Sequence, residues 1–342
     1  MPQTPADPPG LDLGRLRAHL DRELPGAVQG SLRADLIEGG RSNLTYILTD
    51  GAARWVLRRP PLGHVLATAH DMGREHRVMT ALRDTGVPVP RTLLLDPATD
   101  VLGAPWYLME YVSGTAHRDA ATLAALGEQR VQALGRRLVD TLADLHRIDP
   151  AEVGLADFGH PEGYLERQLR RWSTQLAASR SRELPEVDRL HALLAERLPA
   201  SPAPALVHGD YRLDNVLVGE DDAITAVLDW EMSTLGDPLT DVGLLVMYAE
   251  VAGIGGGIIP SAMTAPGFPR PDELVSYYAE LTGRQAADLD WYVAFAAFKL
   301  AAVAEGIHYR YQQGCTLGAG FERAGEMAPI LARYGLATLK EN

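Results

Sequence analysis

The side chains best suited to chemistry lie in the run HGDYRLDN at positions 208–215 and in DWE at 229–231. An Asp and an Asn that flank one tight loop, here Asp210 and Asn215, can direct their oxygens from a single rigid platform. Carboxylate and amide oxygens are hard ligands suited to Mg²⁺. The alternative is that both residues only cap turns. We favour chemistry because the ordered combination with Asp229 is more specific than a lone motif.

The order of these residues resembles a known pattern. A His-x-Asp-x-x-x-x-Asn run, an apolar strand pair and then an acidic residue is similar to the catalytic and metal-binding loops of kinases. The version here is that of aminoglycoside phosphotransferases and related small-molecule kinases. The resemblance implies that Asp210 accepts the proton of the attacking hydroxyl. It also implies that Asn215 and Asp229 hold Mg²⁺ ions that bridge the phosphates of ATP.

Three neighbouring residues have more than one interpretation. Arg212 stands where many kinases have a cation facing the transferred phosphate, but a surface salt bridge is an equal alternative. Glu231 either supplies a further metal oxygen or faces solvent, and we favour the metal. His208 is expected to order the loop by hydrogen bonding and to take no part in the chemistry.

The run GGRSNLTY at 39–46 lies between two predicted strands and looks like the phosphate-covering loop of the same family. Backbone N–H groups and small polar side chains there can approach a nucleotide. The residues that we assign to this role are Gly40, Ser42 and Asn43. The alternative is an ordinary hairpin turn.

The run WVLR at 55–58 resembles the strand that carries the phosphate-binding Lys of the family, with Arg in its place. Strand alternation puts Val56 and Arg58 on one face, so Arg58 is the equivalent residue. Its expected partner is Glu75 on the following helix, in an ion pair that lines the cleft. Arg is permanently charged and binds phosphate in bidentate fashion, so ATP binding is expected to persist with altered geometry.

Two further segments match the family. The run LMEYV at 108–112 resembles the strand that leads to the interlobe hinge, where backbone groups from Glu110 to Val112 would pair with adenine. An ordinary core strand is the alternative. The run GDPLTD at 236–241 predicts a helix start with Asp237 as N-cap and Pro238 at the first helical position. The family residue that matches Asp241 braces the catalytic loop, and we interpret both aspartates as structural.

Hydrophobic periodicity places these motifs on elements. Helices are predicted at 13–24, at 69–83 and through 134–145, with a stop at Asp149-Pro150. Strands are predicted at 31–37, 44–49, 54–58, 91–95, 106–111, 205–208, 216–218 and 224–228. Strands first and helices later indicate an α+β protein. The resemblance makes it a two-lobed protein-kinase-like fold, with a small, mostly β nucleotide-binding lobe at 1–112 and a larger, mostly α catalytic and substrate-binding lobe at 113–342.

Composition limits the partners. The chain has 342 residues and a net charge of -13, which would repel nucleic acid. A single Cys, Cys315, excludes an intrachain disulfide and a Cys-based zinc site, and fits a reducing compartment. A secretory leader and a membrane-spanning run are not evident, so we expect a cytoplasmic protein without a membrane partner. The oligomeric state is left open.

Within the family, the resemblance is strongest to the phosphotransferase domain found free in bacteria and fused to acyl-CoA dehydrogenases in animals. It rests on runs such as GRSNLTY at 40–46, REHRVM at 74–79, FKLAA at 298–302 and GIHYRY at 306–311. The implied acceptor is a hydroxyacyl-CoA, whose phosphates would need cations such as Lys299, His308 and Arg310. One alternative is an aminoglycoside or other antibiotic kinase. Another is a nucleotide-binding regulator without turnover, and the Arg at position 58 is its only support.

Overall fold

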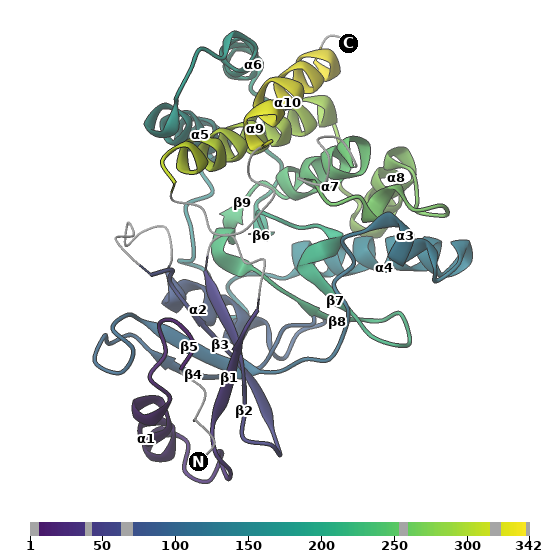
Figure 1. The fold of residues 1–342 in the computed structure, drawn as a ribbon. Coiled ribbons are helices and arrows are strands. Elements are labelled where there is room, and N and C mark those ends of the chain that lie inside the picture. Colours follow the sequence, from purple (N-terminus) through teal and green to yellow (C-terminus); the bar gives the residue numbers. More distant parts are fainter. Residues whose placement is uncertain (1–6, 38–42, 63–70, 253–258, 315–322, 340–342) are drawn as a thin grey trace. The chain divides into compact units, whose positions relative to one another are not determined.

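The computed structural model describes residues 7–37, 43–62, 71–252, 259–314 and 323–339. Gly40, Ser42 and Cys315 therefore lie outside the described residues. The chain divides into two compact units. Unit 1 comprises Met1–Ser113 and Thr225–Glu231, and unit 2 comprises Gly114–Ile224 and Met232–Asn342 (Figure 1).

Unit 1 is built on one five-stranded antiparallel sheet with the order β1-β2-β3-β5-β4. Its strands are β1 (Arg33–Leu36), β2 (Leu44–Thr49), β3 (Arg54–Arg59), β4 (Thr92–Asp96) and β5 (Trp106–Glu110). Asp50 closes the β2–β3 turn, where its carboxylate accepts the N–H groups of Ala52 and Ala53. All five strands were predicted to within about two residues at each end, as hydrogen-bonded strands with clear turn residues allow.

The two faces of this sheet carry different side chains, because successive strand residues point to opposite sides. Helix α1 (Leu13–Glu23) buries Leu16 and Leu20 in one cluster with Trp55 and Leu57 of β3. Helix α2 (Met72–Leu82) packs near β4 and β5, and its Glu75 bonds Arg58. The predicted alternation of Leu57 and Arg58 is thus confirmed.

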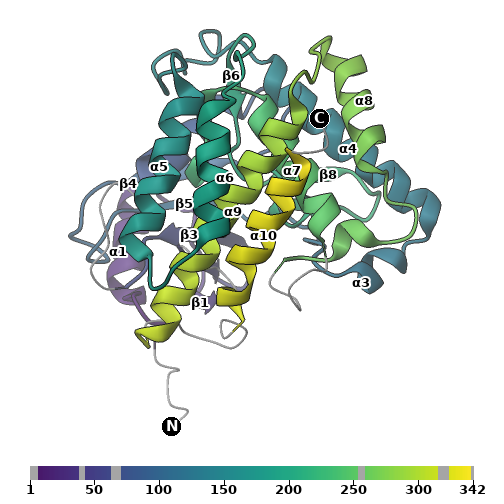
Figure 2. The same ribbon diagram turned by 90° about the horizontal axis from the view of Figure 1, so that it is seen from above.

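Unit 2 is mostly helical. Its helices are α3 (Ala120–Ala124), α4 (Glu128–Arg147), α5 (Tyr164–Ser179), α6 (Pro185–Glu196), α7 (Leu239–Val251), α8 (Pro271–Thr282), α9 (Leu289–Gln312) and α10 (Ala324–Thr338). Helix α9 packs against α5, α7 and α10, and Figure 2 shows α5, α6, α9 and α10 running side by side. Most of α9 between Trp291 and Ile307 is buried, which explains its almost continuous apolar sequence.

Short strands lead into and out of the polar motifs. β6 (Ala205–Val207) leads into the 208–215 run, and β7 (Val216–Val218) follows it, while β8 (Ile224–Val227) leads to Asp229. β6 pairs with β9 (Thr234–Gly236), which the sequence did not predict because three residues show no alternation. Helix α7 begins at Leu239, so placing Pro238 at the first helical position was wrong by one residue. The residue directly before the helix is Pro238, so the predicted N-cap Asp237 is also displaced by one residue, although its carboxylate accepts the Leu239 N–H at 3.0 Å.

These two units confirm the predicted α+β class, with a smaller sheet-based part and a larger helical part. None of the helices in the described ranges is long and apolar enough to cross a membrane.

Candidate active site

The loop after β6 fixes Asp210 against Asn215. Residues Leu213–Asn215 form one turn of 3-10 helix, which brings the Asn215 side chain back over the loop. Its amide Nδ2 donates to the Asp210 backbone oxygen at 2.8 Å and to Asp210 Oδ2 at 3.0 Å. The carboxylate of the predicted base and the amide of the predicted metal ligand are therefore held in one geometry, which is what a proton-accepting group requires.

Buried Asp241 braces the same loop from α7. Its two carboxylate oxygens accept the backbone N–H groups of His208 at 2.7 Å and Gly209 at 2.8 Å. Burial raises the pKa of Asp241, but hydrogen bonds and the nearby imidazoles of His146 and His208 hold this pKa below its ordinary value. His146 of α4 was not predicted, although a His beside the apolar stripe of that helix was a usable signal.

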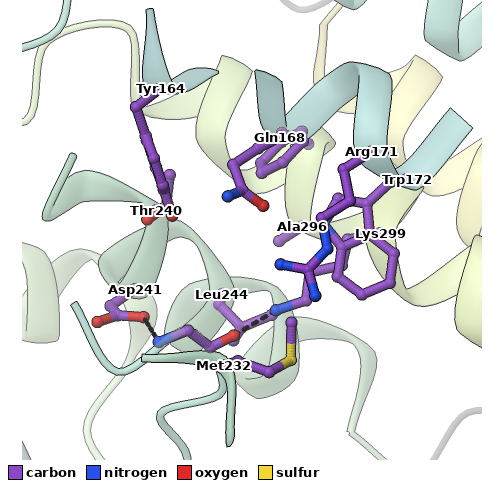
Figure 3. Close-up of a pocket in the computed structure, with 12 residues that line it drawn as sticks. Tyr164, Gln168, Arg171, Trp172, Met232, Thr240, Asp241, Leu244, Ala296 and Lys299 are labelled. Atoms are coloured by element: carbon purple, nitrogen blue, oxygen red, sulfur yellow. Dashed lines mark hydrogen bonds between the residues drawn. The ribbon is translucent and has the colours of Figure 1, made fainter. Parts of the chain in front are cut away.

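Both sides of the Gly209–Asp210 peptide are also fixed. The Asp210 N–H donates to His208 Nδ1 at 3.2 Å, so His208 orders the loop as predicted. The Lys299 ammonium of α9 donates to the Gly209 carbonyl (Figure 3). Gly209 has φ +84°, and a Cβ there would lie 2.7 Å from the Met232 carbonyl oxygen. Only glycine suits this position.

Arg212 lies between two carboxylates. Its Nε is 3.4 Å from Asp210 Oδ2 and 3.4 Å from Asp214 Oδ1, and its guanidinium stacks over the Tyr248 ring at 4.9 Å. Burial raises the pKa of Asp214, and the charge of Arg212 opposes that rise. The salt bridge is thus real, but it includes the carboxylate of Asp210 and is half-buried rather than a surface pair.

A second polar cluster lies within unit 1. The Arg58 guanidinium bonds Glu75 Oε2 at 3.2 Å and Asp229 Oδ1 at 3.0 Å, which confirms the predicted Arg58–Glu75 ion pair. The Glu75 side chain is 0% exposed. Burial raises the pKa of Glu75, and Arg58 opposes that rise. Asp229 has φ +67°, a left-handed conformation that is uncommon outside glycine and often marks functional positions.

Asn43 and Glu231 complete this cluster. The Asn43 amide donates to Glu75 Oε1 at 3.0 Å and to Glu231 Oε2 at 3.1 Å. The Tyr107 hydroxyl donates to Glu75 Oε2 at 2.9 Å, a contact that was not predicted. The strand register could have indicated this contact, since Tyr107 lies directly opposite Arg58.

The predicted hinge residues lie at the end of β5. The Glu110 N–H donates to the Arg91 carbonyl at 2.9 Å, and its carboxylate accepts the Arg91 N–H at 2.9 Å. Val112 follows the strand and is half-buried. The backbone N–H of Glu110 is thus already bonded within the unit.

The oxygen donors of this cluster are of the kind that suits magnesium. Glu75 and Asp229 share the Arg58 guanidinium, and Glu231 joins the same cluster through Asn43. Among the described residues, no group of three or more His, Cys, Asp or Glu side chains is arranged to hold a metal ion. Asn215 belongs to unit 2 and Asp229 to unit 1.

Of the three cations predicted for an acyl-CoA acceptor, only Lys299 reaches the catalytic loop. His308 Nε2 is 3.0 Å from the Gln312 side-chain nitrogen, and Arg310 is exposed further along α9. The buried carboxylate of Glu305, on the same helix, bonds Arg182 at 3.0 Å.

Comparison with known proteins matches this chain to a family of phosphotransferases. Residues 33–274 match the model of the family described as the phosphotransferase enzyme family. Acyl-CoA dehydrogenase family member 11 of Gallus gallus is 34% identical over 341 residues, which cover 96% of this chain. The match covers 44% of that relative, so the chain spans less than half the length of the curated relative.

Solved structures give the same result over whole chains. A Ralstonia eutropha protein provisionally named as an aminoglycoside phosphotransferase is 32% identical, with a TM-score of 0.82 over 96% of this chain and 98% of that one. A spectinomycin phosphotransferase, solved with ADP and spectinomycin, is 14% identical with a TM-score of 0.62. It covers 96% of this chain and 99% of its own, and at this identity it shows the shared fold alone.

Proposed function

This chain belongs to the phosphotransferase enzyme family, and from that premise we propose that it transfers the γ-phosphoryl group of ATP, with Mg²⁺, to a hydroxyl group of a small molecule. The observation that carries the proposal is the Asp210 carboxylate, held by Asn215 on a loop whose backbone is bonded to Asp241. Such a fixed carboxylate is suited to accept a proton from an attacking hydroxyl.

In the proposed reaction, Asp210 takes the hydroxyl proton while the acceptor oxygen bonds to the γ-phosphorus. The bond from that phosphorus to the β–γ bridging oxygen breaks, and ADP leaves. Arg212, next to the Asp210 carboxylate, is placed to attract the transferred phosphoryl group. Mg²⁺, when bound with ATP, neutralises phosphate charge, and Asn215, Asp229 and Glu231 are the residues that would hold it.

Unit 1 would supply the nucleotide contacts. Phosphate oxygens can replace Asp229 as the partner of the Arg58 guanidinium, because a phosphate and a carboxylate both offer anionic oxygens to it. Asp229 would then be released for Mg²⁺, while Glu75 keeps Arg58 in place. The run at 40–43 would cover the phosphates, and Glu110 to Val112 would border the adenine. On this assignment residues 1–112 form the nucleotide lobe and 113–342 the catalytic and acceptor lobe.

For the acceptor we propose a hydroxyacyl-CoA. The name of the Gallus gallus relative supports an acyl-CoA context. The Ralstonia eutropha protein favours the alternative, an aminoglycoside kinase. The two differ in charge, since CoA carries phosphates and aminoglycosides are polycations.

A parallel screen tests the proposal. ATP consumption is measured with the purified chain, Mg²⁺ and hydroxyacyl-CoAs, aminoglycosides or sugars, beside the Asp210→Asn variant. We expect turnover with hydroxyacyl-CoAs that the variant loses. Turnover with aminoglycosides alone would select the antibiotic kinase. Tight ATP binding without turnover of any acceptor would select the regulator.

A further inference from the structure

A pocket opens beside the catalytic loop entirely within unit 2 (Figure 3). Three helices and two loop residues form its wall: Tyr164, Gln168, Arg171 and Trp172 of α5, Thr240, Asp241 and Leu244 of α7, Phe295, Ala296 and Lys299 of α9, with Gly209 and Met232. Gly209 directly precedes Asp210. A molecule in this pocket would therefore lie next to the proposed base.

Two cations face this pocket. The Lys299 ammonium donates to the neutral Gly209 carbonyl and lies 5.3 Å from the centre of the Trp172 ring. The Arg171 guanidinium extends from α5 toward it (Figure 3). In the part of the chain that the structure describes, neither side chain forms an ion pair with a carboxylate.

The only carboxylate in the pocket wall is already used. Asp241 accepts two backbone N–H groups of the catalytic loop and faces His146. Burial lowers the pKa of Lys299, and attraction to Asp210 and Asp241 opposes this. An ammonium removed from water is costly without an opposite charge, and a neutral carbonyl does not supply one. Lys299 therefore lacks a direct ion pair, and an anionic oxygen of a ligand beside Lys299 and Arg171 would supply one.

We propose that this pocket binds the acceptor and that Lys299 and Arg171 recognise an anionic oxygen of it, in a carboxylate or a phosphate. The proposal rests on the proposed phosphotransfer and narrows its acceptor class. A polycationic acceptor is excluded by the same charges, because like charges in a partly buried site repel strongly.

The size of the pocket supports recognition of one small group. Its cavity volume is about 20 Å³, which is room for about one water-sized group. A single anionic oxygen of the acceptor fits beside Lys299. The larger remainder of the acceptor would extend past exposed Arg171 toward solvent.

The test uses pairs of acceptors in which one member is anionic and the other is neutral. Hydroxyoctanoates that differ in hydroxyl position are compared with their neutral amides, and the CoA thioesters with the neutral pantetheine thioesters, with kanamycin as the cation. Each is assayed with the wild type and with Arg171→Gln, Lys299→Met and Arg170→Gln. Arg170 is an exposed neighbour on α5 outside this pocket and is the matched charge control. ATP hydrolysis without acceptor is measured in parallel.

We expect anionic members to be preferred over their neutral counterparts. Arg171→Gln and Lys299→Met should each raise the acceptor KM roughly ten- to hundredfold, as for a lost charge-assisted hydrogen bond. The KM for ATP should stay within about twofold in both variants, and Arg170→Gln should behave as wild type. Preference for free acids would identify a carboxylate, and preference for CoA thioesters a phosphate.

Equal turnover of neutral and anionic members, or turnover of kanamycin, would overturn the inference. So would variants that lower kcat equally for all acceptors and for water at unchanged KM, because Lys299 would then only support the loop. If Lys299→Met does not fold, the acceptor KM of Arg171→Gln alone tests the inference. Hydrolysis of ATP without turnover of any anionic acceptor defeats the inference alone, whereas a failure to bind Mg-ATP defeats the proposed function as well.

Discussion

The two polar clusters, one in each unit, are held in place by different means. In the loop of unit 2 the backbone is fixed, because Asp241 bonds the N–H groups of His208 and Gly209. In unit 1 the cluster is fixed by side chains, because the Arg58 guanidinium joins Glu75 and Asp229. A side chain on a fixed backbone can be changed with little change in geometry. A side chain within a charge cluster cannot, so its loss should affect binding and stability.

The largest effect is expected from Asp210→Asn. The new amide oxygen can still accept the Asn215 N–H, so the loop should keep its shape while the base is lost. Phosphoryl transfer should fall by roughly 10²- to 10⁴-fold, with ATP affinity near that of the wild type. Steady-state kinetics and calorimetry with Mg-ATP measure the two quantities. Near-normal turnover would remove Asp210 from the role of base.

Asp229→Ala should weaken the binding of Mg-ATP and leave the catalytic loop unchanged. It removes an anionic oxygen proposed to hold Mg²⁺, so Mg-dependent ATP affinity should fall by about 100- to 1,000-fold. Calorimetry with and without Mg²⁺ measures it. Asp222→Ala is the matched control, because Asp222 also has positive φ but its carboxylate bonds the exposed side chain of Arg130, outside this cluster. Unchanged Mg-ATP affinity in Asp229→Ala would mean that Asp229 is no metal ligand.

Central features of both clusters could be predicted from the sequence, for reasons that differ between the units. In unit 1, strand alternation alone put Arg58 on the face opposite Leu57, and the structure confirms it. In unit 2, the spacing from Asp210 to Asn215 allowed one turn to bring their side chains together. Both inferences depend on residues near in sequence, where local geometry is decisive.

Contacts between distant residues could not be predicted in the same way. The bonds from Lys299 to Gly209 and from Tyr107 to Glu75 span 90 and 32 positions. The partner of Lys299 could not be predicted, because it depends on how α9 packs against the loop. The β9 strand was missed for a related reason, since its partner β6 decides that three residues form a strand.

Arg58→Ala should destabilise the protein. It leaves Glu75 buried without its cation, which costs about 3 kcal/mol of unfolding free energy for a pair of this kind. Because burial raises the pKa of Glu75 in the folded state, its favourable contribution is present at low pH and is lost as pH rises through that pKa. Without Arg58 the pKa rises further. The destabilisation should therefore be small near pH 5 and larger near pH 8, as measured by urea denaturation at both values.

Two results would contradict this interpretation. A pH-independent loss would point to packing around Arg58 and not to the charge of Glu75. Full activity in a folded Arg58→Ala protein would move phosphate binding to another residue. Arg59 is the first to test, although its guanidinium bonds the carbonyls of Gly10 and Leu102 on the other face of the sheet.

Arg58→Lys should have the smallest effect and separates charge from shape. A Lys ammonium keeps the positive charge, but it cannot match the fork by which Arg58 bonds Glu75 and Asp229 at once. We expect a stability loss of about 1 kcal/mol and recovery of most of the activity that Arg58→Ala loses. Arg54→Lys is the matched control, because Arg54 lies on the same strand but stacks on Tyr111, away from the cluster. If Arg58→Lys is as impaired in ATP binding as Arg58→Ala, the forked guanidinium, which can bond Glu75 and a second anion at once, is required, and charge placement alone is insufficient.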